Sequence, residues 1–127
     1  VRVLTQPCPG LVELVEAGTV ESVEMRTLVS RYTKPLLEAG ADVLVLGCTH
    51  YPFLRAVIQQ QVGPGVALLD TGAAVARRTA AVWSAEQPSS ALPGVGSLQL
   101  FTSGDPAAVS VVASQLWGAA LTVERMR

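Results

Sequence analysis

The chain has 127 residues, half of them hydrophobic, and a formal net charge of −1 that arises from charges of both signs. This length and composition suffice for an ordinary globular domain with its own core, and they exclude a disordered chain. The near-neutral balance argues against nucleic acid and anionic lipid as partners, since both require a basic face.

The cysteine count and the apolar runs exclude three further classes: disulfide-rich, zinc-binding and membrane-spanning proteins. Cys8 and Cys48 are too few for a disulfide framework, and they form no CxxC pair of the kind that binds zinc. The longest apolar runs fall well short of the ~18 residues that a membrane span requires. The chain begins at Val1 in a β-rich stretch without a signal-peptide pattern, which is typical of the middle of a longer protein. We therefore expect a reduced, cytoplasmic protein without a metal site.

Strand and helix patterns alternate along the first part of the chain. Val1–Leu4 is apolar and β-branched and predicts a short strand, and Gly10–Gly18 predicts a short helix. The longest helical pattern covers Val20–Ala39, and Pro35 should kink or interrupt it. Asp42–Leu46 is a continuous apolar run, as in a central parallel strand covered on both faces. The residues expected to form one apolar stripe of the long helix are Val20, Val23, Leu28, Tyr32, Leu36 and Ala39.

The same alternation continues to the C-terminus. The expected elements are a helix over Pro52–Gln61, a strand over Val66–Leu69, a helix over Gly72–Ala85, a loop over Glu86–Ser97, a strand over Leu98–Thr102, a helix over Pro106–Trp117 and a strand over Leu121–Glu124. Asp70 or Thr71 is expected to cap the second of these helices, and Asp105 or Ser103 the third. Such an alternation indicates an α/β fold, a layered domain built on a parallel sheet.

A cysteine, a threonine and the only histidine follow the most central-looking strand. In open α/β sheets, ligands bind beyond the carboxyl ends of the strands. Cys48 would lie near the N-terminus of the helix that starts around Pro52, where free N–H groups favour a thiolate or a bound carboxylate. His50 can pair with the thiol, and Thr49 offers a hydroxyl and an N–H to a substrate. The alternative is an inert buried thiol beside a structural histidine.

Other polar residues have simpler interpretations. The sequence Thr102–Asp105 (TSGD) could form a small anion nest, but a tight turn with a helix cap explains it. Cys8 lies between two prolines and is interpreted as structural. Glu13 and Glu16 fall on a short helix, where a solvated face is the simplest interpretation for both.

The segment LGCTHYPFL resembles the C-terminal signature of the glutamate racemase family, which belongs to the aspartate/glutamate racemase superfamily of cofactor-independent amino-acid racemases. The segments that carry the resemblance are Pro7–Gly18, Tyr32–Leu54, Leu68–Ala76 and Phe101–Val109. They cover essentially the whole chain in the family's order.

This resemblance implies racemisation of L- and D-glutamate, which supplies D-glutamate for peptidoglycan. Two cysteines would act from opposite sides of the glutamate Cα, without pyridoxal phosphate or any other cofactor. Cys48 matches the second of these cysteines, and His50 matches the histidine that assists it. Thr49, together with His50, would hold the substrate. Glu16 matches an acidic residue near the family's site.

The sequence departs from the family in one large respect. The other catalytic cysteine of the family lies in a C-N-T motif, which is absent here, and Cys8 does not match it. The family enzyme has two α/β domains and about twice this length. Residues 1–66 are therefore expected to form most of the second domain, and residues 67–127 to return to the missing first domain. A boundary at Val66–Thr71 is favoured over one in the Glu86–Ser97 loop. The 127 residues alone are expected to be inactive as a racemase.

Three alternatives remain open at this point. The chain could be a truncated homologue that acts only as a module binding a ligand or a partner protein. It could belong to a racemase of the aspartate type. It could also be a Cys–His nucleophilic hydrolase. A homodimer is compatible with each of them.

Overall fold

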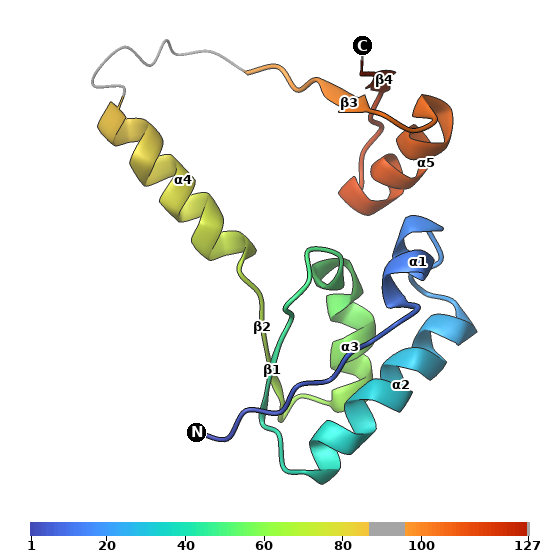
Figure 1. The fold of residues 1–127 in the computed structure, drawn as a ribbon, viewed down its shortest axis with the longest axis vertical. Coiled ribbons are helices and arrows are strands. Elements are labelled where there is room, and N and C mark those ends of the chain that lie inside the picture. Colours follow the sequence, from blue (N-terminus) through green and yellow to red (C-terminus); the bar gives the residue numbers. More distant parts are fainter. Residues whose placement is uncertain (87–95, 127) are drawn as a thin grey trace.

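The computed structural model describes residues 1–86 and 96–126 (Figure 1). In chain order their elements are α1 (Leu11–Glu16), α2 (Val23–Glu38), β1 (Val43–Val45), the 3-10 helix η1 (Tyr51–Leu54), α3 (Arg55–Val62), β2 (Ala67–Leu69), α4 (Gly72–Glu86), β3 (Leu100–Thr102), α5 (Pro106–Trp117) and β4 (Val123–Arg125). The predicted loop over Glu86–Ser97 lies mostly outside the described residues.

Two small parallel sheets organise these elements. β1 pairs with β2 in parallel, with Leu44 opposite Leu68, and β3 pairs with β4 in parallel, with Phe101 opposite Glu124. The α/β fold with parallel strands, predicted from the alternation of elements, is confirmed. Figure 1 shows that α4 leaves the β1–β2 sheet and extends away from it.

The core lies between the β1–β2 sheet and the first three helices. Leu44 and Leu68 face this core because alternate side chains of a strand point to opposite faces. Its fully buried side chains are Val15 of α1, Met25 and Val29 of α2, and Leu54 of η1. Leu46 and Leu54 are both buried, so the loop between them, residues 47–53, is anchored in the core at both ends. This loop carries the Cys-Thr-His motif.

The N-terminal segment differs from its prediction. Val1–Leu4 is not a strand, because it has no hydrogen-bonded partner strand in the described part of the chain, and Val1 and Val3 are exposed. A cavity of about 750 Å³ lies among this segment, α2 and β1. An apolar, β-branched pattern alone does not make a strand, because a strand also requires a ladder of hydrogen bonds to a neighbouring strand.

The long helix also differs from its prediction in three ways. It begins at Val23, because Ser22 caps it by accepting a hydrogen bond from the N–H of Met25 at 3.0 Å. Pro35 does not interrupt it: the helix continues to Glu38, and the Ala39 N–H binds the Pro35 carbonyl at 3.1 Å. The buried stripe is Met25, Val29 and Thr33, whereas Val23 is 82% exposed. Leu28, Tyr32 and Leu36 flank this stripe and are partly buried.

The prediction that β1 is covered on both faces is wrong for the described residues. Val43 and Val45 are exposed, and so is Leu69 of β2, on the face away from the helices. The helix predictions in the second half agree better. α5 covers the expected residues, and the Asp105 side chain caps it by accepting from the N–H groups of Ala107 and Ala108. No helix among the described residues is long and apolar enough to cross a membrane.

Candidate active site

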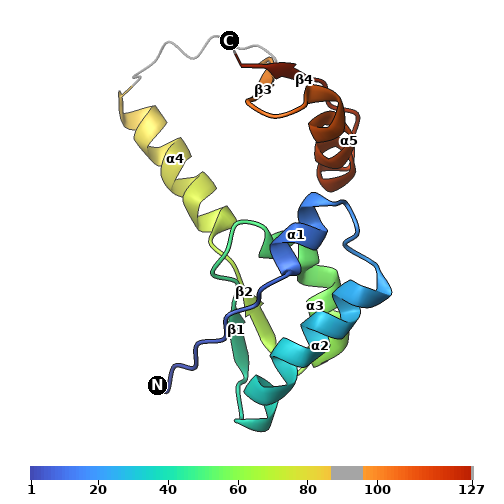
Figure 2. The same ribbon diagram turned by 45° about the vertical axis from the view of Figure 1, so that its right-hand side comes forward.

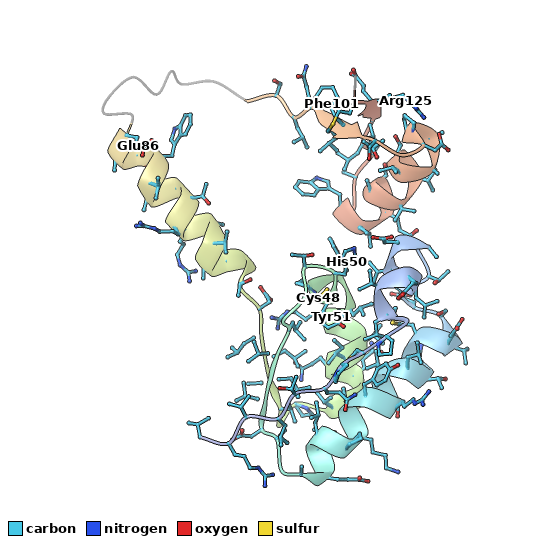
Figure 3. All side chains as sticks on the ribbon, viewed as in Figure 1. Cys48, His50, Tyr51, Glu86, Phe101 and Arg125 are labelled. Atoms are coloured by element: carbon cyan, nitrogen blue, oxygen red, sulfur yellow. The ribbon has the colours of Figure 1, made fainter. Side chains whose placement is uncertain are left out.

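The cysteine of interest follows directly on β1, at the carboxyl edge of the sheet. The last rung of the ladder is the hydrogen bond from the Leu46 N–H to the Leu69 carbonyl, at 2.7 Å. The chain then turns, and the N–H of Tyr51 binds the Cys48 carbonyl at 3.2 Å. The Cys48 thiol is free and partly buried at this turn. Figure 3 shows Cys48, His50 and Tyr51 close together near the upper end of α3.

His50 connects the thiol to a carboxylate from another element. Its Nδ1 lies 3.9 Å from the Cys48 Sγ and 3.5 Å from the Thr49 Oγ1. Its Nε2 lies 3.1 Å from the Glu16 Oε1. An ionised carboxylate only accepts hydrogen bonds, so the imidazole donates Nε2–H to Glu16. A neutral His50 therefore presents the lone pair of Nδ1 to the thiol. This arrangement can take a proton from Cys48 and return it.

The helix α1 determines which glutamate reaches the histidine. Glu16 is the last residue of α1, and its carboxylate lies against His50, whereas Glu13, one turn earlier, makes no side-chain hydrogen bond among the described residues. The His50 side chain is 30% exposed and that of Glu16 67%. The solvated-face interpretation of Glu16 is therefore incomplete, because its side chain is exposed yet has a specific partner.

Tyr51 is the residue at this site that the sequence analysis did not single out. Burial raises the pKa of its phenol to about 12, with smaller contributions from the neighbouring Cys8 and Cys48 side chains. Burial also raises the pKa of the Cys8 thiol, although a hydrogen bond with Tyr51 opposes this shift. Cys8 in turn contacts the carbonyl of Gln6 at 3.3 Å. The phenol therefore stays neutral and joins the Cys8 segment to the Cys48 loop. Its adjacency to His50 was the only signal available in the sequence.

A second polar pair lies at the carboxyl end of the neighbouring strand β2. Asp70 accepts a hydrogen bond from the N–H of Gly72 at 3.0 Å, as expected for a residue that caps α4. It also forms an ion pair with Arg55, which donates a further hydrogen bond to the Leu68 carbonyl at 3.2 Å. The hydrogen bond from Arg55, followed by that from Gly72, lowers the pKa of Asp70. This ion pair, which the sequence analysis missed, ties α3 to the start of α4.

The cavity beside the N-terminal segment is separate from the thiol site. Cys8 and Tyr51 line it, but Cys48 and His50 do not. We therefore assign the candidate site to the sheet edge at Cys48 rather than to this cavity. Among residues 1–86 and 96–126, no three or more His, Cys, Asp or Glu side chains gather as a metal site would require.

The fold and the site together define a class of protein. It is an α/β domain in which an imidazole contacts both a thiol and a carboxylate at the carboxyl end of a parallel strand. Residues 3–79 match the family model described as Asp/Glu/Hydantoin racemase. The chain therefore belongs to the Asp/Glu/hydantoin racemase family.

Individual relatives agree with this assignment. The chain is 57% identical over 107 residues to a glutamate racemase of Herpetosiphon aurantiacus, a match that covers 84% of this chain and 42% of the relative. It is 44% identical over 127 residues to a glutamate racemase of Pseudomonas putida strain W619, covering all of this chain and 48% of the relative.

A solved structure leads to the same conclusion about the fold. Glutamate racemase from Thermus thermophilus in complex with beta-chloro-D-alanine superposes with a TM-score of 0.76 at 33% identity, covering 95% of this chain and 46% of that one. The chain thus spans about half the length of the curated relatives it matches.

Proposed function

We propose that this chain carries one half of a cofactor-independent glutamate racemase site. The observation that carries the proposal is the arrangement of Cys48, His50 and Glu16, with 3.9 Å between thiol and imidazole and 3.1 Å between imidazole and carboxylate. The names of the relatives support glutamate as the substrate. The chemistry is general acid–base catalysis by a thiol, which a nearby base can hold as the thiolate.

In this mechanism the Cys48 thiolate removes the α-proton from one enantiomer and becomes a thiol. A second thiol then delivers a proton to the opposite face of the planar carbanion, and the reverse reaction exchanges the two roles. His50 accepts and returns the Cys48 proton, and Glu16 keeps the imidazole in the tautomer that allows this transfer. Thr49 contributes a hydroxyl beside the thiol for the substrate.

The second thiol has to come from outside these residues. Cys8 is the only other cysteine of the chain. Its thiol contacts the Gln6 carbonyl, and Cys8 lines the cavity beside the N-terminal segment, which Cys48 does not line. We therefore propose that the reaction requires the half of the relatives that this chain does not match. We use the term complete racemase for residues 1–127 together with that half. Residues 1–66 would form the lobe with Cys48, and residues 67–127 would return to the unmatched half. The complete racemase would supply D-glutamate for bacterial peptidoglycan in the cytoplasm.

A Cys–His–carboxylate arrangement also occurs in thiol hydrolases, so the geometry of Cys48, His50 and Glu16 supports a thiol hydrolase as the second candidate function. The two candidates differ in the fate of Cys48. A hydrolase forms a covalent acyl intermediate on the thiol, whereas a racemase only moves protons through it.

The decisive experiment is deuterium incorporation at Cα in D₂O. D- and L-glutamate are incubated separately with the complete racemase, with its Cys48→Ser variant and with the 127-residue chain. We expect exchange of both enantiomers by the complete racemase, loss of racemisation in Cys48→Ser, and no racemisation by the 127 residues alone. Aspartate is the matched substrate control. The absence of exchange by the complete racemase, or an acyl adduct on Cys48 with an ester substrate, would overturn the proposal.

A further inference from the structure

The C-terminal unit, which comprises residues 96–126 with β3, α5 and β4, makes one polar side-chain contact with the end of α1. Gln115 of α5 donates a hydrogen bond from its Nε2 to the carbonyl of Gly18, at 2.6 Å and across 97 residues of sequence. Among the described residues, this is the side-chain hydrogen bond that joins residues 96–126 to residues 1–86. The neighbouring Leu116 packs against the apolar core at the same place. Figures 1 and 2 both show α5 above the end of α1.

Gly18 is shaped for this contact. Its φ is +71°, in the left-handed region that glycine adopts without strain, and a Cβ at this position would lie 2.7 Å from the Gln115 Oε1. The whole amide of Gln115 therefore covers a residue that has no side chain. Replacement of Gly18 by alanine would displace the amide and strain the backbone together.

The segment that Gln115 holds is the end of the helix that supplies Glu16. Ala17 and Gly18 close α1, with hydrogen bonds from the Gly18 N–H to the Val15 carbonyl and from the Thr19 N–H to the Leu14 carbonyl, both at 2.9 Å. A six-residue helix has little stability of its own, so its last turn depends on such contacts. Glu16 lies two residues before Gly18, and its carboxylate reaches His50.

We propose that Gln115 is a positioning residue of this site, which holds the end of α1 so that Glu16 meets His50 and His50 meets Cys48. This inference rests on the proposed function and deepens it, because the C-terminal unit then controls the proton transfer at Cys48. When Gln115 of α5 binds Gly18, Glu16 holds the His50 imidazole in the orientation that proton transfer requires. When this contact is lost, the Glu16 side chain is free to rotate into solvent.

The test uses the complete racemase and the substitution Gln115→Leu, which keeps the size of the side chain and removes the donor. Gln99→Leu is the matched control, since Gln99 is exposed on the same unit and forms no side-chain hydrogen bond among the described residues. We expect Gln115→Leu to lower kcat about three- to tenfold, the range that one hydrogen bond of ~1 kcal/mol allows, with little change in KM. Gly18→Ala should lower kcat to a similar extent, because the added methyl group would displace the Gln115 amide.

Two further readouts separate positioning from a structural effect. The primary isotope effect with 2-deuterated glutamate should rise for one enantiomer only, because only the proton transfer at Cys48 becomes slower. In a Glu16→Ala background, Gln115→Leu should cause no further loss, since residues that act in series are not additive.

An isotope effect that rises equally for both enantiomers or for neither, an additive loss, or a Gln115→Leu variant as active as Gln99→Leu would overturn this inference while the parent enzyme still racemises. A parent that does not racemise glutamate would overturn the proposed function, and this inference with it.

Discussion

At the scale of single residues, the site depends on which of two similar glutamates reaches the histidine. The sequence places Glu13 and Glu16 on the same short helix and gives no reason to separate them, because both lie outside its apolar stripe. The structure separates them: the Glu16 carboxylate lies 3.1 Å from the His50 Nε2, and Glu13 is exposed. The resemblance to the racemase family implies a role for Glu16, and Glu16 is also the glutamate whose carboxylate contacts His50; a catalytic role for it stays a prediction.

We therefore expect Glu16→Ala and Glu13→Ala to differ sharply in the complete racemase. Loss of a hydrogen bond to a charged group costs about 1.5–3 kcal/mol in buried settings, and less here because Glu16 is largely exposed. Glu16→Ala should lower kcat roughly five- to tenfold, and Glu13→Ala should leave it unchanged. Alanine favours the helix in both variants, so circular dichroism should match the parent. Equal activity of the two variants in steady-state assays would exclude the assigned role of Glu16.

At the scale of elements, the local signals predicted most of the structure. Asp105 begins α5 at the expected residue, and Gly18 and Gly40 end helices with the positive φ that glycine permits. These are interactions between near neighbours in the sequence. The errors lie where distant residues decide. Within residues 1–86 and 96–126, Val1–Leu4 has no partner strand, and β1 is covered on only one face.

The features of the site likewise divide into those that neighbouring residues determine and those that distant residues determine. The position of Cys48 after a strand, with Thr49 and His50 beside it, could be predicted from the sequence because strand ends form sites in α/β folds. The contact between Gln115 and Gly18 could not, because nothing in the local pattern of either residue indicates a partner 97 residues away. The neutral phenol of Tyr51 between two thiols likewise depends on tertiary packing.

The ion pair between Arg55 and Asp70 leads to a prediction about pH at this scale. The pKa of Asp70 is lower in the folded chain than its ordinary value, so its contribution to stability is complete above about pH 5 and is lost as the pH falls through the folded pKa, below ~3.9. The urea midpoint of the chain should therefore fall more steeply between pH 5 and pH 3 than that of Asp70→Asn. Because Arg55 and Asp70 connect α3 to the start of α4, the loss should appear first at that junction.

Asp42→Asn serves as the control, since Asp42 is exposed and forms no ion pair among the described residues. Its urea midpoint should follow the parent at each pH. If Asp70→Asn and the parent lost stability in parallel on acidification, the ion pair would contribute nothing measurable, as is common for exposed pairs.

At the scale of the whole molecule, the buried and exposed apolar residues are unevenly distributed. The first three helices share one core with the β1–β2 sheet, whereas α4 has no buried residue along its 15 residues. Val75 of α4 is 58% exposed and Trp83 is 65% exposed, and the outer face of the sheet exposes Val45. Parallel sheets are normally covered on both faces, so these surfaces match the proposal that residues 67–127 return to another lobe.

Amide hydrogen exchange can test this division of the molecule. An isolated helix of this length is marginal in water even when it is rich in alanine, because most helical stability comes from packing. In the 127-residue chain, the amides of α4 should therefore exchange within about a hundredfold of an unstructured peptide, whereas those of α2 around Met25 and Val29 should be far slower. In the complete racemase, α4 should become protected and α2 should change little. If α4 were as protected as α2 in the 127-residue chain at every protein concentration, it would be stable without the unmatched half, and residues 67–127 would not depend on another lobe. Protection that rose with concentration would instead assign the exposed face of α4 to a second copy of the chain, and the proposed return to the unmatched half of the relatives would be wrong.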